Sequence, residues 1–161
     1  MASRREYPDR PIVGVGGVII EKGRVVLIRR GTEPLKGEWS IPGGILKLGE
    51  SLEAGVAREL LEETGLQVQV LDLIEVFDRI YYDDAVRATE SPRPPRFHYV
   101  IADYLCQQIE GGLKAGGDVT DVAIVSEDQL NKFNLTPTAT RILKKAFQME
   151  RMRRSKDNDP H

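Results

Sequence analysis

The hydrophobic positions of this chain form short runs separated by turn residues, and only a few stretches repeat with helical spacing. The β-branched runs 12–20 and 25–28 flank a turn-forming segment at 21–24, which predicts a β-hairpin. A short strand is expected at 39–41, immediately before a Pro-Gly-Gly sequence at 42–44. Further strands are expected at 68–77, 97–105 and 122–125.

The clearest helical pattern starts at Ser51, a residue type that caps helix N-termini, and stops at Gly65, a residue type typical of C-terminal caps. Leu52, Val56 and Leu60 recur every four residues, so we expect them to form the buried stripe of this helix.

Two more helices are expected late in the chain, a short one near 126–130 and a longer one from 137 to 149. Because the helices are inserted unevenly among the strands, this order indicates an α/β fold with a mixed sheet and not a strict βαβ repeat.

The composition is that of an ordinary globular protein, with 161 residues, 40% of them hydrophobic and 30% charged. This length corresponds to one domain, expected at 11–150, with a flexible N-terminus at 1–10 and a disordered polar tail at 151–161. The formal net charge of −2 argues against a protein that holds nucleic acid electrostatically. A polyanionic ligand would have to be held by a few local cations or by bound metal.

Cys106 is the only cysteine, which excludes an internal disulfide and a thiolate metal cage, and its apolar surroundings predict a core position. No stretch approaches the roughly 18 apolar residues that a membrane helix needs, and the N-terminus lacks the apolar core of a signal peptide. We therefore expect a cytoplasmic protein.

The segment with the most chemistry contains Glu59, Glu62 and Glu63, whose spacings of three and four place them on one patch of a helix. Three glutamates alone most often mean a solvated helix face. The neighbouring Gly43 and Gly44 change this interpretation, because glycines allow a tight turn that presents carbonyl oxygens to a ligand. Carboxylate and carbonyl oxygens are the hard ligands that Mg²⁺ or Mn²⁺ prefers, so the patch indicates a divalent metal site.

The segment Gly44-x5-Glu50-x7-Arg58-Glu59-Leu60-x-Glu62-Glu63-x-Gly65-Leu66 resembles the Nudix box, the signature of MutT-like hydrolases, at every defined position. The likeness extends to the preceding residues 39–44 and to the order of the expected elements. It implies the Nudix fold, a mixed β-sheet sandwiched between helices (α/β/α), in which the box forms a loop–helix–loop. It also implies a pyrophosphohydrolase that cleaves the phosphoanhydride bond of a nucleoside diphosphate linked to another moiety.

By the same resemblance, Glu59, Glu62 and Glu63 supply the ligands of a Mg²⁺ (or Mn²⁺) cofactor, together with a carbonyl at Gly43 or Gly44. A diphosphate is stable in water because its negative charge repels hydroxide and makes phosphorus a poor electrophile. A bound divalent ion neutralises phosphate oxygens and lowers the pKa of a bound water, and so overcomes both obstacles.

Glu50 and Arg58 are then expected to hold Glu59 in place. The general base stays open between a box glutamate and an acid from a loop outside the box. The candidates outside the box are Asp83, Asp84, Asp118 and Asp121.

Substrate-binding residues must lie outside the box. Arg29 and Arg30 at the end of the second strand are candidates for phosphate, with a solvated strand end as the alternative. Trp39 and Phe97, and also Tyr99, are candidates for stacking on a base, with a core position as the alternative.

The substrate itself has conflicting signals. Tyr81 and Tyr82 fall where dinucleoside polyphosphate hydrolases of the Nudix family carry a tyrosine, whereas the strand at 96–104 resembles members that act on ADP-ribose. We expect ADP-ribose or a similar nucleotide sugar, with an oxidised nucleoside triphosphate or a dinucleoside polyphosphate as the alternative.

Two other classes of function stay open. A Nudix module can sense nucleotides without cleaving them, although this box is intact. Hydrolysis at an RNA 5′ end would need a basic track, and the clusters 144–145 and 151–154 are better explained as a solvated helix face. The expected partner is thus a small-molecule nucleoside diphosphate derivative, with no nucleic acid and no membrane, and a homodimer is left open.

Overall fold

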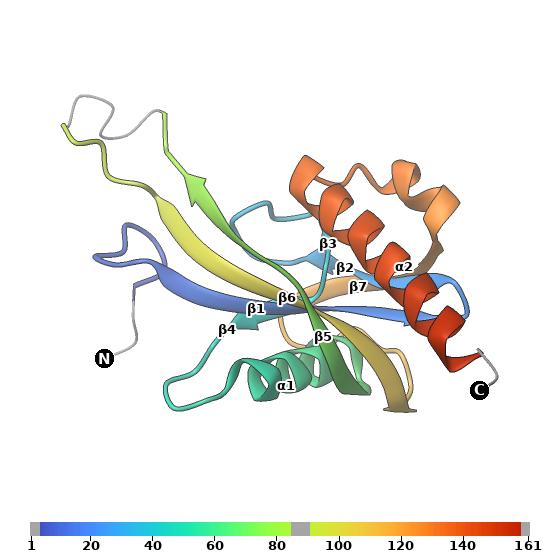
Figure 1. Cartoon of the computed structure of the whole chain (residues 1–161). Coiled ribbons are helices and arrows are strands. Elements are labelled where there is room, and N and C mark those ends of the chain that lie inside the picture. The colour runs from blue at the N-terminus through green and yellow to red at the C-terminus, as the bar shows by residue number, and fades with distance from the viewer. Residues whose placement is uncertain (1–3, 85–90, 159–161) are drawn as a thin grey trace.

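The structure, a computed structural model, describes residues 4–84 and 91–158, and a twisted mixed sheet forms its central layer (Figure 1). The strands are β1 (Ile12–Glu21), β2 (Arg24–Arg30), β3 (Trp39–Ser40), β4 (Gly43–Ile45), β5 (Leu66–Tyr81), β6 (Phe97–Gly111) and β7 (Val119–Ser126). The helices are α1 (Leu52–Thr64), the 3₁₀ helix η1 (Glu127–Phe133) and α2 (Pro137–Asp157).

The strand order confirms the expected mixed sheet. Its main path is β3-β2-β1-β6-β5, with β4 paired to β1 and β7 paired to β2. The β1–β6 pair is parallel, and the other pairs are antiparallel. The predicted hairpin joins β1 to β2 through Lys22 and Gly23, both with left-handed φ angles (51° and 74°), as a tight two-residue turn requires.

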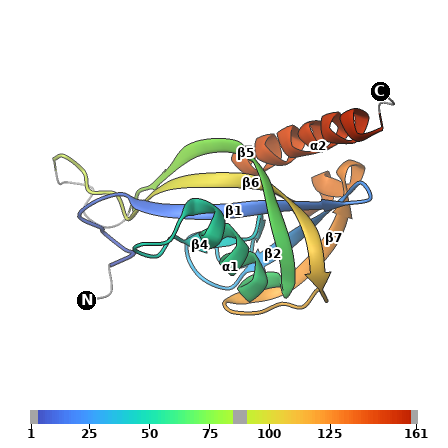
Figure 2. The ribbon, with the colours of Figure 1, turned by 60° about the horizontal axis from the view of Figure 1, so that its bottom comes forward.

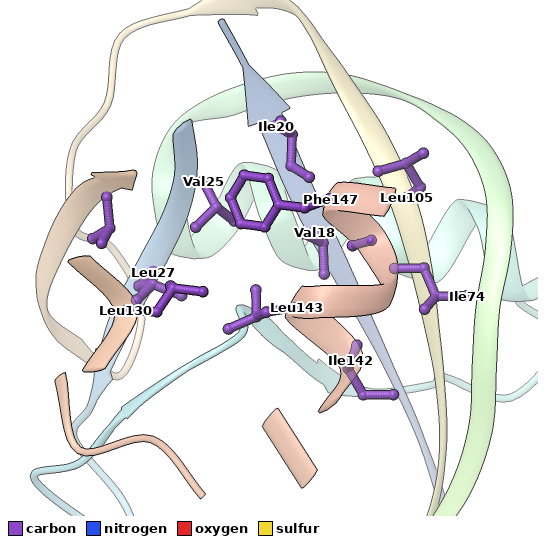
Figure 3. Close-up of a cluster of buried hydrophobic side chains, with 12 residues drawn as sticks. Val18, Ile20, Val25, Leu27, Ile74, Leu105, Leu130, Ile142, Leu143 and Phe147 are labelled. Atoms are coloured by element: carbon purple, nitrogen blue, oxygen red, sulfur yellow. The ribbon is translucent and has the colours of Figure 1, made fainter. Parts of the chain in front are cut away.

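The two long helices cover opposite faces of the sheet, which confirms the α/β/α arrangement (Figure 2). On the α2 side, Leu143 and Phe147 of α2 pack with Val18 of β1 and Leu105 of β6 (Figure 3). On the other side, α1 packs against a second apolar cluster. The members of that cluster from α1, β1 and β6 are Val56, Leu60, Val15, Ile19, Ala102, Tyr104 and Cys106. Because β1 is covered on both faces, its sequence is a nearly continuous apolar run.

The helix α1 has the predicted caps but a different buried stripe. Ser51 accepts a hydrogen bond from the N–H of Ala54, and Gly65 adopts the left-handed conformation. Val56 and Leu60 are buried as expected, whereas the side chain of Leu52 is 37% exposed. The buried positions of α1 begin only at Gly55, so the prediction for Leu52 was wrong.

The strands β5 and β6 are longer than predicted, because they pair with each other along their whole length, from Leu66 opposite Gly111 to Tyr81 opposite Phe97. Both strands therefore extend beyond their predicted hydrophobic stretches into more polar residues. The short strand β4 was not predicted, since its glycines carry no strand signal.

The prediction of a disordered tail at 151–161 is wrong for residues 151–157, which continue α2. Arg154 Nε donates a 3.0 Å hydrogen bond to Glu150 one turn earlier, and Arg151 Nη1 lies 2.7 Å from a carboxylate oxygen of Glu127 on η1. At the other end, the N–H of Tyr7 donates to the carbonyl of Arg96, so part of the segment expected to be flexible contacts the sheet.

Cys106 is 1% exposed, and burial raises the pKa of its thiol to about 12, which confirms a core position. Within residues 4–84 and 91–158, no helix is both long enough and apolar enough to span a membrane.

Candidate active site

Arg58 holds the box together through a fork of hydrogen bonds from α1. Its Nε and Nη2 donate to the two carboxylate oxygens of Glu50 at 2.6 and 2.8 Å, and Nη2 also donates to the carbonyl of Ile45 at 3.1 Å. Its Nη1 donates to Glu59 Oε1 at 2.7 Å. The hydrogen bonds from Arg58 lower the pKa of Glu50 to about 2. The contacts expected between Arg58 and its two acidic neighbours are thus present, and their role in catalysis stays a prediction.

The carboxylate of Glu59 lies directly against the backbone of Gly44. A Cβ atom at Gly44 would overlap all three atoms of this carboxylate, so only glycine leaves room for it. The sequence predicted that Gly44 allows a tight turn. The structure adds a second reason for glycine here, the close approach of the Glu59 carboxylate.

Glu63 is largely buried beside the same glycine pair. Its Oε1 accepts a 2.6 Å hydrogen bond from the backbone N–H of Gly43. Burial raises the pKa of Glu63 to about 7. The hydrogen bond from the Gly43 N–H lowers this pKa, whereas the nearby charge of Glu59 raises it further. It is the N–H of Gly43, and not a carbonyl, that faces this carboxylate.

The three box glutamates are not gathered as closely as predicted. In the described ranges, no group of three or more Asp, Glu, His or Cys side chains lies close enough together to hold a metal ion. Glu62 is half exposed and lies 3.3 Å from Arg58, while Glu63 is turned toward Gly43. Arg58 thus binds Glu59 and Glu62, while the Gly43 N–H binds Glu63.

The donor set nevertheless fits a divalent cation. Glu59 and Glu63 face neighbouring glycines, and the charge of Glu59 disfavours the ionised form of Glu63. A cation between the two carboxylates would remove this repulsion, and hard carboxylate oxygens suit Mg²⁺ or Mn²⁺.

A cavity of about 560 Å³ opens beside these acids and extends over the α2 face of the sheet. Its described lining includes Arg30 but not Arg29, Trp39 or Phe97. Arg30 is largely buried, donates a 2.6 Å hydrogen bond to the carbonyl of Pro34, and interacts electrostatically with Glu63. Arg30 is thus the predicted phosphate-binding residue that the structure brings to the box.

The other three predicted substrate-binding residues point elsewhere, which corrects those predictions. Arg29 alternates with Arg30 along β2, is exposed, and donates to the carbonyl of Gly37. Trp39 packs edge-on against Phe133 with ring centroids 5.2 Å apart. Phe97 is 3% exposed and belongs to a small core cluster, so the alternative core interpretation holds for both aromatic rings.

Of the four candidate bases outside the box, Asp118 lines the described part of the cavity. Asp121 instead accepts a hydrogen bond from the adjacent N–H of Val122, and Asp84 pairs with Arg93 at 2.7 Å. Asp83 is not among the lining residues.

Tyr99, a stacking candidate from the sequence, lines the cavity, as do Arg79 and Asp103, which the sequence did not indicate as site residues. The available signal for Asp103 was an acid inside an otherwise apolar strand. The sequence did not indicate which residues surround Asp103, because these contacts form only where β5 and β6 pair.

The fold and the box geometry define this chain as a NUDIX domain. The NUDIX domain family model matches residues 10–146, and the chain belongs to this family. The hydrolases of the family act on phosphoanhydride bonds. The expected family and fold class are therefore confirmed.

Relatives and solved structures agree with this assignment. An ADP-ribose pyrophosphatase of Methanocaldococcus jannaschii is 34% identical over 122 residues, which cover 76% of this chain and 66% of that protein. A putative ADP-ribose pyrophosphatase of Bacillus subtilis, YjhB, is 27% identical over 77% of this chain and 54% of its own length. The chain thus spans between about half and two thirds of these relatives.

Among solved structures, a MutT NUDIX hydrolase from Burkholderia pseudomallei is similar with a TM-score of 0.69 and 29% identity, covering 85% of this chain and 98% of that one. The NUDIX domain of Shewanella oneidensis NrtR, complexed with ADP ribose, has a TM-score of 0.66 at 20% identity and covers 89% of this chain and 90% of that one. At this identity, the second comparison shows likeness of fold alone.

Proposed function

We propose that this chain is a Nudix pyrophosphohydrolase that cleaves the phosphoanhydride bond of a nucleoside diphosphate linked to another moiety, with ADP-ribose as the preferred substrate. The observation that carries the proposal is the placement of Glu59 and Glu63 on the Gly43–Gly44 pair, beside Arg30 and at one end of a cavity large enough for a nucleotide. We expect the reaction to take place in the cytoplasm.

Glu59 and Glu63 would hold Mg²⁺ or Mn²⁺, with Glu62 nearby on the exposed side of α1. A divalent ion bound there neutralises phosphate oxygens and makes a water molecule more acidic.

The side chains of this chain have separate tasks in this proposal. Arg30 binds a phosphate oxygen, since its guanidinium already lies in the cavity next to the box. Arg58 keeps Glu59 oriented through the shared fork with Glu50. Asp118, the candidate outside the box that lines the cavity, accepts the proton of the attacking water.

Two relatives named ADP-ribose pyrophosphatases favour this substrate. An alternative has its own support: a putative 8-oxo-dGTP diphosphatase 2 of Mycobacterium tuberculosis is 41% identical over 86 residues, which cover 52% of this chain and 58% of that protein. We therefore keep an oxidised nucleoside triphosphate as the second candidate.

A substrate panel with Mg²⁺ and with Mn²⁺ tests the proposal. ADP-ribose, 8-oxo-dGTP, a diadenosine polyphosphate and a UDP-sugar are incubated with the full chain, and the products are separated by chromatography. We expect ADP-ribose to give AMP and ribose 5-phosphate with the highest kcat/KM. Tight nucleotide binding without turnover of any compound would instead identify a sensor module.

The role of Asp118 is tested in the same assay. Asp118→Asn is expected to lower kcat by about 100-fold, in the range of general acid–base catalysis. Asp121→Asn is the matched control, since Asp121 lies three residues away outside the described cavity lining. Equal activity of the two variants would exclude Asp118 as the base.

A further inference from the structure

Asp103 of β6 is a buried carboxylate without a protein partner. Its side chain is 4% exposed, and Thr64 is the other buried polar side chain in the part of the chain that the structure describes. Thr64 is fully hydrogen-bonded, since its Oγ1 donates to the carbonyl of Leu60 and accepts from the N–H of Leu66. No group within residues 4–84 and 91–158 donates a hydrogen bond to Asp103. Its oxygens are not among the fully enclosed polar atoms without a partner in the described chain, so they face the open space of the cavity, where a ligand can donate to them.

The backbone makes room for this carboxylate at one particular place. Gly16 of β1 lies opposite Asp103 in the parallel β1–β6 pair, and a Cβ atom at Gly16 would overlap Asp103 Oδ1. The carboxylate thus lies over the bare backbone of Gly16 and forms part of the cavity lining. The missing side chain of Gly16 thus leaves space for the Asp103 carboxylate, although no group of the described chain hydrogen-bonds to this carboxylate.

The cation that acts electrostatically on Asp103 is Arg79, and it does not pair with this carboxylate. Arg79 of β5 donates to the hydroxyl groups of Tyr81 and Thr136, each at 3.2 Å, and it forms no ion pair with Asp103 among the described residues. Burial raises the pKa of Asp103 to about 7, with Arg79 opposing this shift and Glu75 adding to it. The carboxylate therefore retains its capacity to accept a hydrogen bond from a ligand.

Besides Arg79 and Tyr81, aromatic and apolar side chains also line the cavity. Phe77 and Tyr99 line it from β5 and β6, and Ala139 and Ile142 line it from α2. Such walls suit a flat ring, and a single acceptor among them suits a ring that carries an N–H donor.

The position also fits the far end of the proposed substrate. Gly16 pairs with Gly43 on one side and with Asp103 on the other. Two strand spacings therefore separate the backbone of Asp103 from the glycine that binds Glu63, a distance of about 10 Å. This leaves space for a ribose between a diphosphate at the box and a base at Asp103.

We infer that Asp103 accepts a hydrogen bond from an N–H group of the substrate's nucleobase and thereby helps to determine which nucleotides the enzyme takes. The inference rests on the proposed function, because it assumes that the diphosphate lies at the box. It assigns the aromatic end of the cavity to the base and the box end to the reacting phosphates.

The test compares ADP-ribose with its analogue in which purine replaces adenine, so that a hydrogen atom replaces the 6-amino group. We expect the wild-type chain to prefer ADP-ribose by about tenfold or more in kcat/KM, the range for a hydrogen bond to a charged group. Asp103→Ala should bring this preference close to one, mainly by raising KM for ADP-ribose. Asp103→Asn, which keeps the shape and one acceptor oxygen, should give an intermediate preference.

Asp78→Ala is the matched control, because Asp78 is an exposed acid on β5 outside the described cavity lining. It should keep the wild-type preference. An undiminished preference in Asp103→Ala, or an equal loss of activity on both compounds, would overturn the assignment to the base.

A failure of the proposed function would look different. If the wild-type chain hydrolyses neither compound, binding of AMP and of purine riboside 5′-monophosphate is measured by calorimetry on the same variants. A preference for AMP that disappears in Asp103→Ala supports the inference without any hydrolysis. A preference that is absent from the wild type, or that persists in the variant, contradicts it.

Discussion

Glu63 Oε1 accepts a 2.6 Å hydrogen bond from the backbone N–H of Gly43, a residue twenty positions earlier in the chain. This contact joins the last turn of α1 to the glycine pair Gly43–Gly44, the second of which is the first residue of the box. Because Glu59 lies against the neighbouring Gly44, both ends of the box meet at one short piece of backbone. The geometry of the acids therefore depends on two glycines that themselves carry no functional group.

Gly44→Ala should impair catalysis without unfolding the chain. The new methyl group would overlap the Glu59 carboxylate and displace it, and a displacement of about 1 Å at a reacting centre reduces activity by about 100-fold. The measurement is kcat/KM together with circular dichroism. Gly112→Ala is the control, because a Cβ at Gly112 meets no atom within 4 Å. Wild-type activity in Gly44→Ala would show that Glu59 does not need this position.

Glu63→Gln should abolish most activity while leaving the fold intact. The amide keeps an oxygen that accepts from Gly43, but it removes the charge proposed to bind the metal, so we expect kcat to fall by about 100-fold or more. Titration calorimetry with Mn²⁺ should show weaker binding. Glu53→Gln, an exposed substitution in the first turn of α1, serves as control. Turnover of Glu63→Gln within a few-fold of wild type would refute the metal assignment.

Arg58→Lys should lower kcat/KM by about 10- to 100-fold, because a single ammonium group cannot reproduce the fork that joins Glu50 to Glu59. The pKa of Glu50 should rise from about 2 toward its ordinary value, which NMR titration can follow. Arg154→Lys is the control, since Arg154 makes one exposed ion pair on α2. Unchanged activity with an unchanged Glu50 titration would contradict this role of Arg58.

Asp103 should make the chain less stable at neutral than at acidic pH. Its pKa is raised from 3.8 to about 7 in the folded state, so the folded chain binds the proton more tightly than the unfolded chain. The free energy of unfolding should therefore fall as the pH rises from about 4 through about 7, by about 4 kcal/mol at most, and then level off at higher pH. Arg79 and Glu75 are the charged groups that act on this carboxylate.

Asp103→Asn removes the titration of Asp103. The titration of Glu63 is the same in the variant and the wild type, so the difference between the two proteins reports Asp103 alone. Urea unfolding at pH 5, 6 and 8 should show that the variant gains stability over the wild type as the pH rises. A difference between the two proteins that does not change with pH would exclude a raised pKa at Asp103.

Local patterns predicted much of the fold because they depend on neighbours in the sequence. The cap at Ser51, the end at Gly65 and the hairpin turn at Lys22–Gly23 are all present. The failures share a cause: they depend on contacts between distant segments. Residues 151–157 are helical, with one ion pair to η1, and the polar ends of β5 and β6 are strands because they face each other.

The sequence by itself determined the box, its helix and the chemical identity of the acids, since their spacing is a local property of one short segment. Only the tertiary structure decided that Arg30 enters the cavity while Arg29 turns away, and that Asp103 lies bare over Gly16. These relationships arise where β1, β2 and β6 meet. Strand pairing and the alternation of side chains along each strand determine which residues line the same cavity. The linear sequence does not show these contacts between distant segments.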